Sequence, residues 1–255
     1  MSNSHNWFAG GAVTHDRADF DETRHAGTSA GAARKSACAT IWLLVAFTAH
    51  AQQLDQLLSR LDQSAASFTG ARADVKVATY TASIHQTDTD SGSILVREIS
   101  PGKIEFRIDI AGDNAYALLV RGSEIEYYHP QNNTIDVYEL GKYRNTAQTL
   151  MALGFGTSGR DLKANYSIAN LRRETVDGQP SISMDLTPKS ADLMEKTHLQ
   201  KVEVSLAESN LLPVREKFSF KGGDTRTADY SKVQTGVKIP SSTLDLPKNA
   251  KKNKH

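Results

Sequence analysis

The chain has 255 residues, and its 30 Lys and Arg against 29 Asp and Glu give a formal net charge of +1 at pH 7. This balance offers no basic stripe from which a nucleic-acid binder could gain by counterion release, so that class is excluded. The single cysteine, Cys38, lies in a segment that we expect to be removed. Disulfides, thiolate nucleophiles and cysteine metal sites are therefore excluded from the mature chain.

The first 33 residues are polar, rich in glycine and alanine, and without hydrophobic periodicity. Such a composition cannot bury enough apolar surface to build a core. Residues 1–33 are therefore expected to be a disordered leader, unless translation starts downstream of Met1.

Residues 34–51 have the order of a secretory signal. Arg34 and Lys35 precede an apolar run of about 13 residues, which is short of the ~20 that a bilayer-crossing helix needs. The run ends in Ala49-His50-Ala51, a small-x-small triplet typical of a cleavage site. We predict export with cleavage after Ala51; a buried helix of a cytosolic domain is the alternative.

The mature chain begins with a helical pattern and continues with strand patterns. Apolar residues between Leu54 and Phe68 recur on one helical face. After Gly70 the period becomes two, most clearly over Lys103–Ile110. The other predicted strands are Ala73–Tyr80, Ser93–Glu98, Tyr116–Arg121, Glu124–Tyr128, Thr134–Leu140, Ser181–Leu186, Lys201–Leu206, Val214–Lys221 and Thr225–Val233.

Turn signals such as Asp177-Gly178 separate these strands, and short turns between consecutive strands imply antiparallel pairing. We therefore expect residues 52–247 to form one mainly β domain built on a single antiparallel sheet. The opening helix and a second helical pattern over Asn145–Phe155 are available to cover its apolar face. Periodicity leaves open whether a packed core or an apolar cavity lies between them. The basic tail, residues 248–255, is expected to be a disordered, solvated end.

Three patterns that could signal chemistry lack the required context. Gly27-Thr28-Ser29-Ala30-Gly31 matches a hydrolase nucleophile elbow but precedes the signal segment. The run 154–159 matches G-x-G-x-x-G but follows a helical pattern instead of a strand, so a helix cap and hinge is the better interpretation. His85, His129 and His198 have no partner at ligand spacing. We predict no catalytic residues, no metal and no cofactor.

Glu216 is the one charge on the apolar side of its predicted strand, beside Val214, Phe218 and Phe220. It is either an edge residue or the partner of a buried basic group. We favour the edge.

Several segments follow one another in an order that resembles the periplasmic outer-membrane lipoprotein carrier (LolA-like) family. They are the opening helix, Ser93-Ile94-Leu95-Val96-Arg97, Ile125-Glu126-Tyr127-Tyr128-His129-Pro130, Leu186-Thr187-Pro188-Lys189 and Leu244-Asp245-Leu246-Pro247. Residues 138–143 and 153–159 look like a branch of outer membrane lipoprotein-sorting relatives. The resemblance covers nearly the whole mature chain, and its weight comes from the order of the segments.

The resemblance implies an open half-barrel covered by the N-terminal helix and a helical lid. Its interior would hold acyl chains of lipoproteins, or another lipid, in transit from the inner to the outer membrane. It further implies a monomeric, non-enzymatic periplasmic protein that meets an inner-membrane release complex and an outer-membrane acceptor. A lipid- or protein-sensing regulatory module of the same fold is the alternative.

The predicted site residues follow from this resemblance and from the alternation. The concave face is assigned to Ile104, Phe106, Ile108, Leu118, Val120, Ile125, Tyr127, Ile182, Met184, Val202, Val204, Phe218 and Phe220. The lid is assigned to Leu150, Met151 and Phe155, and the lid hinge to Gly154, Gly156 and Gly159. The family latches its lid with an Arg-Pro pair, which is interrupted here between Arg97 and Pro101, so Arg97 is the nearest candidate for the latch.

Overall fold

The computed structural model describes residues 40–255 except 101 and 152, and it leaves out the side chains of 40–51, 147 and 150. The leader, residues 1–33, and positions 34–39 of the signal segment lie outside the described residues. Residues 40–51 form the first turns of α1, so the predicted cleavage site falls inside this helix. Leu57, Leu58 and Leu61 of α1 pack on the domain and come after Ala51, so cleavage there would keep these contacts. The cleavage itself stays a prediction.

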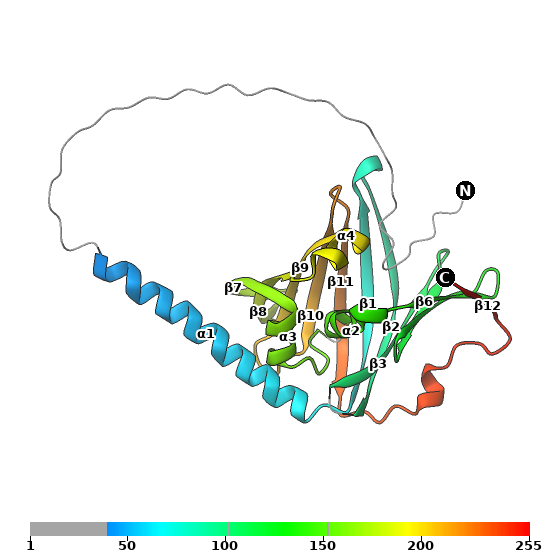
Figure 1. Cartoon of the computed structure of the whole chain (residues 1–255), viewed down its shortest axis with the longest axis horizontal. Coiled ribbons are helices and arrows are strands. Elements are labelled where there is room, and N and C mark those ends of the chain that lie inside the picture. Colours follow the sequence, from blue (N-terminus) through cyan, green and yellow to red (C-terminus); the bar gives the residue numbers. More distant parts are fainter. Residues whose placement is uncertain (1–39, 101, 152) are drawn as a thin grey trace, which may run out of the picture.

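The domain is mainly β, with four α-helices among the described residues (Figure 1). The helices are α1 Thr40–Ala66, α2 Arg144–Met151, α3 Gly159–Asn165 and α4 Ala191–Thr197, with 3-10 turns η1 Ala82–Ile84, η2 Gly141–Tyr143 and η3 Ser241–Leu244. The strands are β1 Gly70–Thr81, β2 Gln86–Ser100, β3 Lys103–Ala111, β4 Tyr116–Arg121, β5 Glu124–His129, β6 Thr134–Glu139, β7 Tyr166–Val176, β8 Gln179–Pro188, β9 Leu199–Ala207, β10 Pro213–Phe220, β11 Thr225–Thr235 and β12 Lys251–Lys254. No helix in this described part has the length and hydropathy needed to cross a bilayer.

The strands form one open sheet in the order β12-β6-β5-β4-β3-β2-β1-β11-β10-β9-β8-β7. Two meanders, β1–β6 and β7–β11, are joined where β1 pairs with β11. The predicted single antiparallel sheet is thus confirmed, except that β12 pairs with β6 in parallel. The predicted turn Asp177-Gly178 is also confirmed, because both residues have positive φ (48° and 80°) and Val176 pairs with Gln179 across them.

Helices α1 and α3 and the chain around α2 lie on one face of the sheet. The buried side chains on this face form two clusters. The first interior cluster combines inward side chains of β1–β5 with Phe68, Met151 and Phe155. The second interior cluster combines β8–β10 with Leu57, Leu58 and Leu61 of α1 and Leu162 of α3. Figure 1 shows α1 and α3 beside the β7–β8 end and α2 before the middle strands.

The opposite face of the β2–β6 half is covered by the chain between β11 and β12. Ile239, Leu244 and Leu246 are buried against outward residues of β4 and β6, forming the outer cluster. The chain then ends in β12, where Lys252 pairs with Glu126 at 2.7 Å. The prediction of a disordered tail at 248–255 is therefore wrong, because residues 251–254 gain backbone hydrogen bonds from β6.

Candidate functional site

The strand residues predicted to line the concave face all point toward the helix-covered side of the sheet. Ile104, Phe106, Ile108, Leu118, Val120, Ile125 and Tyr127 belong to the first interior cluster. Ile182, Met184, Val202, Val204 and Phe218 belong to the second, and Phe220 packs half-buried against it. The structure thus places the predicted residues in two groups beneath different elements.

The first interior cluster is closed by residues 144–158, which we call the covering segment. Met151 and Phe155 are 8% and 1% exposed and pack among the inward strand residues, while the side chain of Leu150 lies outside the described part. The ring of Phe155 meets that of Tyr230 edge-on, with centroids 5.5 Å apart. Gln148 also donates a hydrogen bond to the Gly122 carbonyl at 3.3 Å. The covering segment is therefore held by apolar contacts with the strands and by the hydrogen bond of Gln148.

The three glycines predicted as a hinge lie where the chain approaches its neighbours closely. Gly156 has φ +85°, and a Cβ there would lie 2.5 Å from the Phe68 ring. Gly159 leaves only 2.2 Å between such a Cβ and the Leu58 carbonyl oxygen, and Gly154, with φ +71°, packs against Pro213. These contacts explain why glycine is needed at all three positions, two in the covering segment and one at the start of α3. Motion about these positions stays a prediction.

Arg97 lies on the wrong face to be the predicted latch. Along β2, Ile94 and Val96 enter the first interior cluster, so Arg97 points to the opposite side of the sheet. Its Nη1 donates to Glu105 Oε2 at 2.9 Å, and Glu105 also accepts from Arg121 at 3.1 Å. Arg121 in turn pairs with Asp245 of the C-terminal segment. Arg97 therefore belongs to an ion network under that segment and not to the covering segment.

Glu216 also departs from expectation. Its strand β10 lies between β9 and β11, so the prediction of an edge position is wrong. The side chain is buried, with the residue 3% exposed, and the Tyr230 hydroxyl donates to its Oε2 at 2.9 Å. Burial raises the pKa of Glu216 to about 8, although the Tyr230 hydrogen bond opposes the shift. The described hydrogen-bond partner of Glu216 is thus the phenol of Tyr230 and not a buried basic side chain, which was the alternative prediction.

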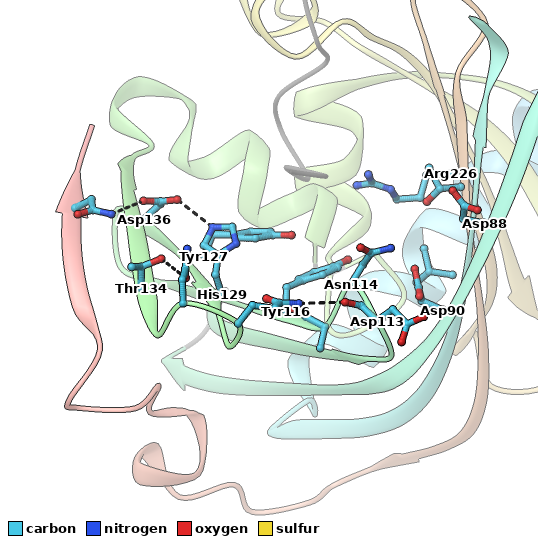
Figure 2. Close-up of a pocket in the computed structure, with 16 residues that line it drawn as sticks. Asp88, Asp90, Asp113, Asn114, Tyr116, Tyr127, His129, Thr134, Asp136 and Arg226 are labelled. Atoms are coloured by element: carbon cyan, nitrogen blue, oxygen red, sulfur yellow. Dashed lines mark hydrogen bonds and ion pairs between the residues drawn. The ribbon is translucent and has the colours of Figure 1, made fainter. Parts of the chain in front are cut away.

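A polar pocket of about 510 Å³ adjoins the first interior cluster (Figure 2). Val77, Tyr116 and Tyr127 belong to both, and the two tyrosine rings stack with centroids 5.0 Å apart. The rest of the lining is Thr79, Asp88, Asp90, Asp113, Asn114, Ala115, His129, Gln131, Asn132, Thr134, Asp136, Arg226 and Asn253. The polar pocket therefore borders the apolar interior through shared side chains, and this places polar and apolar surface next to each other, as a ligand with an apolar tail and a polar end requires.

The pocket walls carry charges of both signs. Figure 2 shows Asp88, Asp90 and Arg226 at one end and the hairpin residues His129 and Asp136 at the other. Burial opposes ionisation of the Asp136 carboxyl, but hydrogen bonds from Asn253, His255 and His129 outweigh it and hold its pKa below the ordinary value. The pocket thus keeps an ionised carboxylate at its hairpin end.

At the other end, desolvation lowers the pKa of the Arg226 guanidinium, whose residue is only 8% exposed. Burial, and then the neighbouring Tyr116, raise the pKa of Tyr127, so the phenol between the two ends stays neutral. No group of three or more His, Cys, Asp or Glu within the described ranges is arranged to hold a metal ion.

Solved structures similar to this chain share its fold at low sequence identity. An uncharacterized conserved protein from Thermus thermophilus is 10% identical, with a TM-score of 0.51, over 81% of this chain and 99% of that one. An outer membrane lipoprotein-sorting protein domain from Vibrio parahaemolyticus is 12% identical, with a TM-score of 0.43, over 76% and 95%. A LolA superfamily protein from Nitrosomonas europaea is 15% identical, with a TM-score of 0.40, over 76% and 97%.

Comparison with protein-family models gave no match, and comparison with curated proteins gave none either. Since one fold serves many functions, the ligand has to be argued from the site itself.

Proposed function

We propose that this chain is a periplasmic carrier that binds the acyl chains of lipoproteins, or of another lipid, between its covering segment and the sheet. The observation that carries the proposal is that the first interior cluster and the polar pocket adjoin and share the side chains of Tyr116 and Tyr127. An acyl tail fits the apolar part and its polar head the pocket. The LolA-like resemblance of the sequence supports export to the periplasm and the absence of enzymatic activity.

In the structure, the covering segment packs on the strands, and we call this the closed form. Met151 and Phe155 here occupy the volume that an acyl chain would take. Burying one methylene gains about 0.8 kcal/mol, so a long chain gains roughly 10 kcal/mol in an ideal site. Part of this gain is offset because the ligand first has to displace the covering segment from the strands. The competition keeps binding weak enough for release, which a carrier needs.

The first interior cluster is a better ligand site than the second. Above it lie one helix of eight residues and a loop. The second cluster is sealed by three leucines of α1 together with Leu162 of α3 and Leu153 of the covering segment. Exchanging the smaller cover for a ligand breaks fewer contacts, so we assign Ile182, Met184, Val202, Val204 and Phe218 to the permanent core.

Binding is tested with the full chain purified from a bacterial periplasmic extract, by identifying co-purifying lipid with mass spectrometry. We expect an acylated molecule at near-stoichiometric amount in the wild type and its loss in Met151→Asp, which places a charge in the covering segment. Met194→Asp, a matched change on the half-buried face of α4, should retain the lipid. Lipid at equal, trace levels in all three proteins would contradict the proposal.

Carriage between membranes needs a second measurement, because a lipid-sensing module of the same fold would bind lipid without handing it on. A fluorescent phospholipid is placed in donor vesicles of phosphatidylethanolamine and phosphatidylglycerol, with unlabelled acceptors. A carrier accelerates transfer in proportion to its concentration, whereas a sensor leaves the rate unchanged. Direct capture of the inner- and outer-membrane partners implied by the resemblance would then identify the route.

A further inference from the structure

One oxygen of the buried Glu216 side chain is without a hydrogen-bond partner among the described residues. The Glu216 carboxyl has one oxygen, Oε2, that accepts from Tyr230, and another, Oε1, that has no hydrogen-bond partner in the described structure. Buried polar groups are nearly always paired, and leaving one unpaired costs about 1–3 kcal/mol. The unpaired oxygen of Glu216 therefore destabilises the closed form by about this amount.

The protonation of Glu216 determines which partner is missing. Burial raises the pKa of the carboxyl to about 8, so at neutral pH it is the uncharged acid. Because the Tyr230 hydroxyl donates to Oε2, the acid proton resides on Oε1 and points to no acceptor. The missing partner is therefore a hydrogen-bond acceptor.

Glu216 lies at the boundary between the two interior clusters and below the covering segment. It pairs across the sheet with Ala228 of the first cluster and with Val204 of the second. The ring of Tyr230, the hydrogen-bond partner of Glu216, packs edge-on with the ring of Phe155. Movement of Phe155 away from the sheet would uncover the Glu216–Tyr230 pair at the floor of the proposed acyl site.

We propose that Glu216 and Tyr230 are a polar anchor that binds the carbonyl oxygen of an ester- or amide-linked acyl chain. The inference rests on the proposed lipid binding and narrows it to neutral acyl derivatives. An ester or amide carbonyl accepts the acid proton and brings no charge into the interior. A free fatty carboxylate would have to be desolvated, and an alkane would leave the donor unpaired.

The test measures displacement of the dye N-phenyl-1-naphthylamine from the full chain by two ligands of equal carbon count, methyl palmitate and heptadecane. Wild type is expected to bind methyl palmitate more tightly. Glu216→Leu removes the donor and should weaken methyl palmitate about two- to tenfold while leaving heptadecane unchanged. Glu216→Gln keeps an N–H donor and an acceptor for Tyr230, so it should restore most of the preference.

The outcomes separate the anchor from lipid binding itself. Equal affinity of wild type and Glu216→Leu for methyl palmitate overturns the anchor and leaves lipid binding standing, because an internal water then satisfies the acid. Failure of wild type to bind dye and both ligands overturns both proposals. Heptadecane binding also reports whether Glu216→Leu is folded. Tyr230→Phe is a second variant: it removes the hydrogen bond to Glu216 Oε2 and is expected to reduce the preference for methyl palmitate over heptadecane.

Discussion

The two interior clusters grow from the same sheet with the same alternation of side chains, yet they are covered differently. The second cluster is closed mainly by α1 and α3, with Leu153 of the covering segment, and is largely aliphatic. The first cluster contains more aromatic rings, among them Phe106, Tyr116 and Tyr127, and it is closed by the short covering segment. At one end the first cluster borders the polar pocket, with which it shares Tyr116 and Tyr127.

This difference teaches that alternation alone identifies a core-facing side chain but not an exchangeable one. An apolar face is available to a ligand when the element that covers it makes few contacts that must be broken, and when a polar pocket adjoins it. By both criteria we expect the β1–β6 half to bind the ligand and the β7–β10 half to be the framework.

The largest effect is expected from truncating the cover. Phe155→Ala should lower the free energy of unfolding by about 3–5 kcal/mol, because it removes a fully buried ring. It should also raise the affinity for a lipid dye, since less of the cover has to be displaced. Urea denaturation and dye titration measure the two quantities. Leu58→Ala in the second cluster should cost about 2–5 kcal/mol without any gain in affinity; a gain there would break the division.

A pH dependence is expected from Glu216. Its pKa rises from the ordinary value of 4.5 to about 8 in the folded chain, so the folded state binds the extra proton between these values. This contribution is fully present below pH 4.5 and is lost as the pH rises through 8, at up to about 1.4 kcal/mol per pH unit. Denaturation from about pH 5 to pH 8 should show a steeper fall for wild type than for Glu216→Gln. Parallel curves would mean that the carboxyl is solvated.

A smaller effect is expected at the close approach of the covering segment. Gly156→Ala should cost about 1–3 kcal/mol, because φ is positive there and the new methyl would strike the Phe68 ring. Gly178→Ala is the matched control, since Gly178 also has positive φ but no atom within 4 Å of the added Cβ. Equal losses in thermal unfolding would show that packing at Gly156 adds nothing.

The smallest effect is expected on the outer face. Asp245→Asn removes the 2.9 Å ion pair with Arg121, in which both side chains are more than a third exposed. Solvent screening limits the loss of stability to at most about 1 kcal/mol. Lipid-dye affinity should not change. A large change in affinity would connect the outer face to the site and contradict the account.

Much of the sheet could be predicted because burial on one face imposes a period of two, as in β3. Strand β7 could not, because it is an edge strand whose residues are mostly exposed. Strand β12 could not either, because its Lys-rich sequence has no apolar face and its pairing depends on the backbone of β6. The alternation in β2 could have excluded Arg97 as a latch, since it shares a face with Leu95 of the outer cluster.

The site was harder to predict than the fold. The apolar lining followed from alternation, but its division into two clusters depends on where α1 and the covering segment lie. The pocket draws residues from strands and turns far apart in the chain, so no local spacing marks it. Glu216 was placed on the correct face, but its edge position was predicted wrongly. Strand β10 lies between β9 and β11, and the order of these three predicted strands with short turns between them already indicated an internal strand.

The central claim is that an acyl chain lies between the covering segment and the strands of the first interior cluster. The most direct test is photo-crosslinking of the full chain with a phospholipid that carries a diazirine in its acyl chain, followed by peptide mass spectrometry. We predict labels on Met151, Phe155 and inward residues of β3–β5 such as Phe106. Labels confined to α1 and β8–β10, or to the outer face, would contradict the claim.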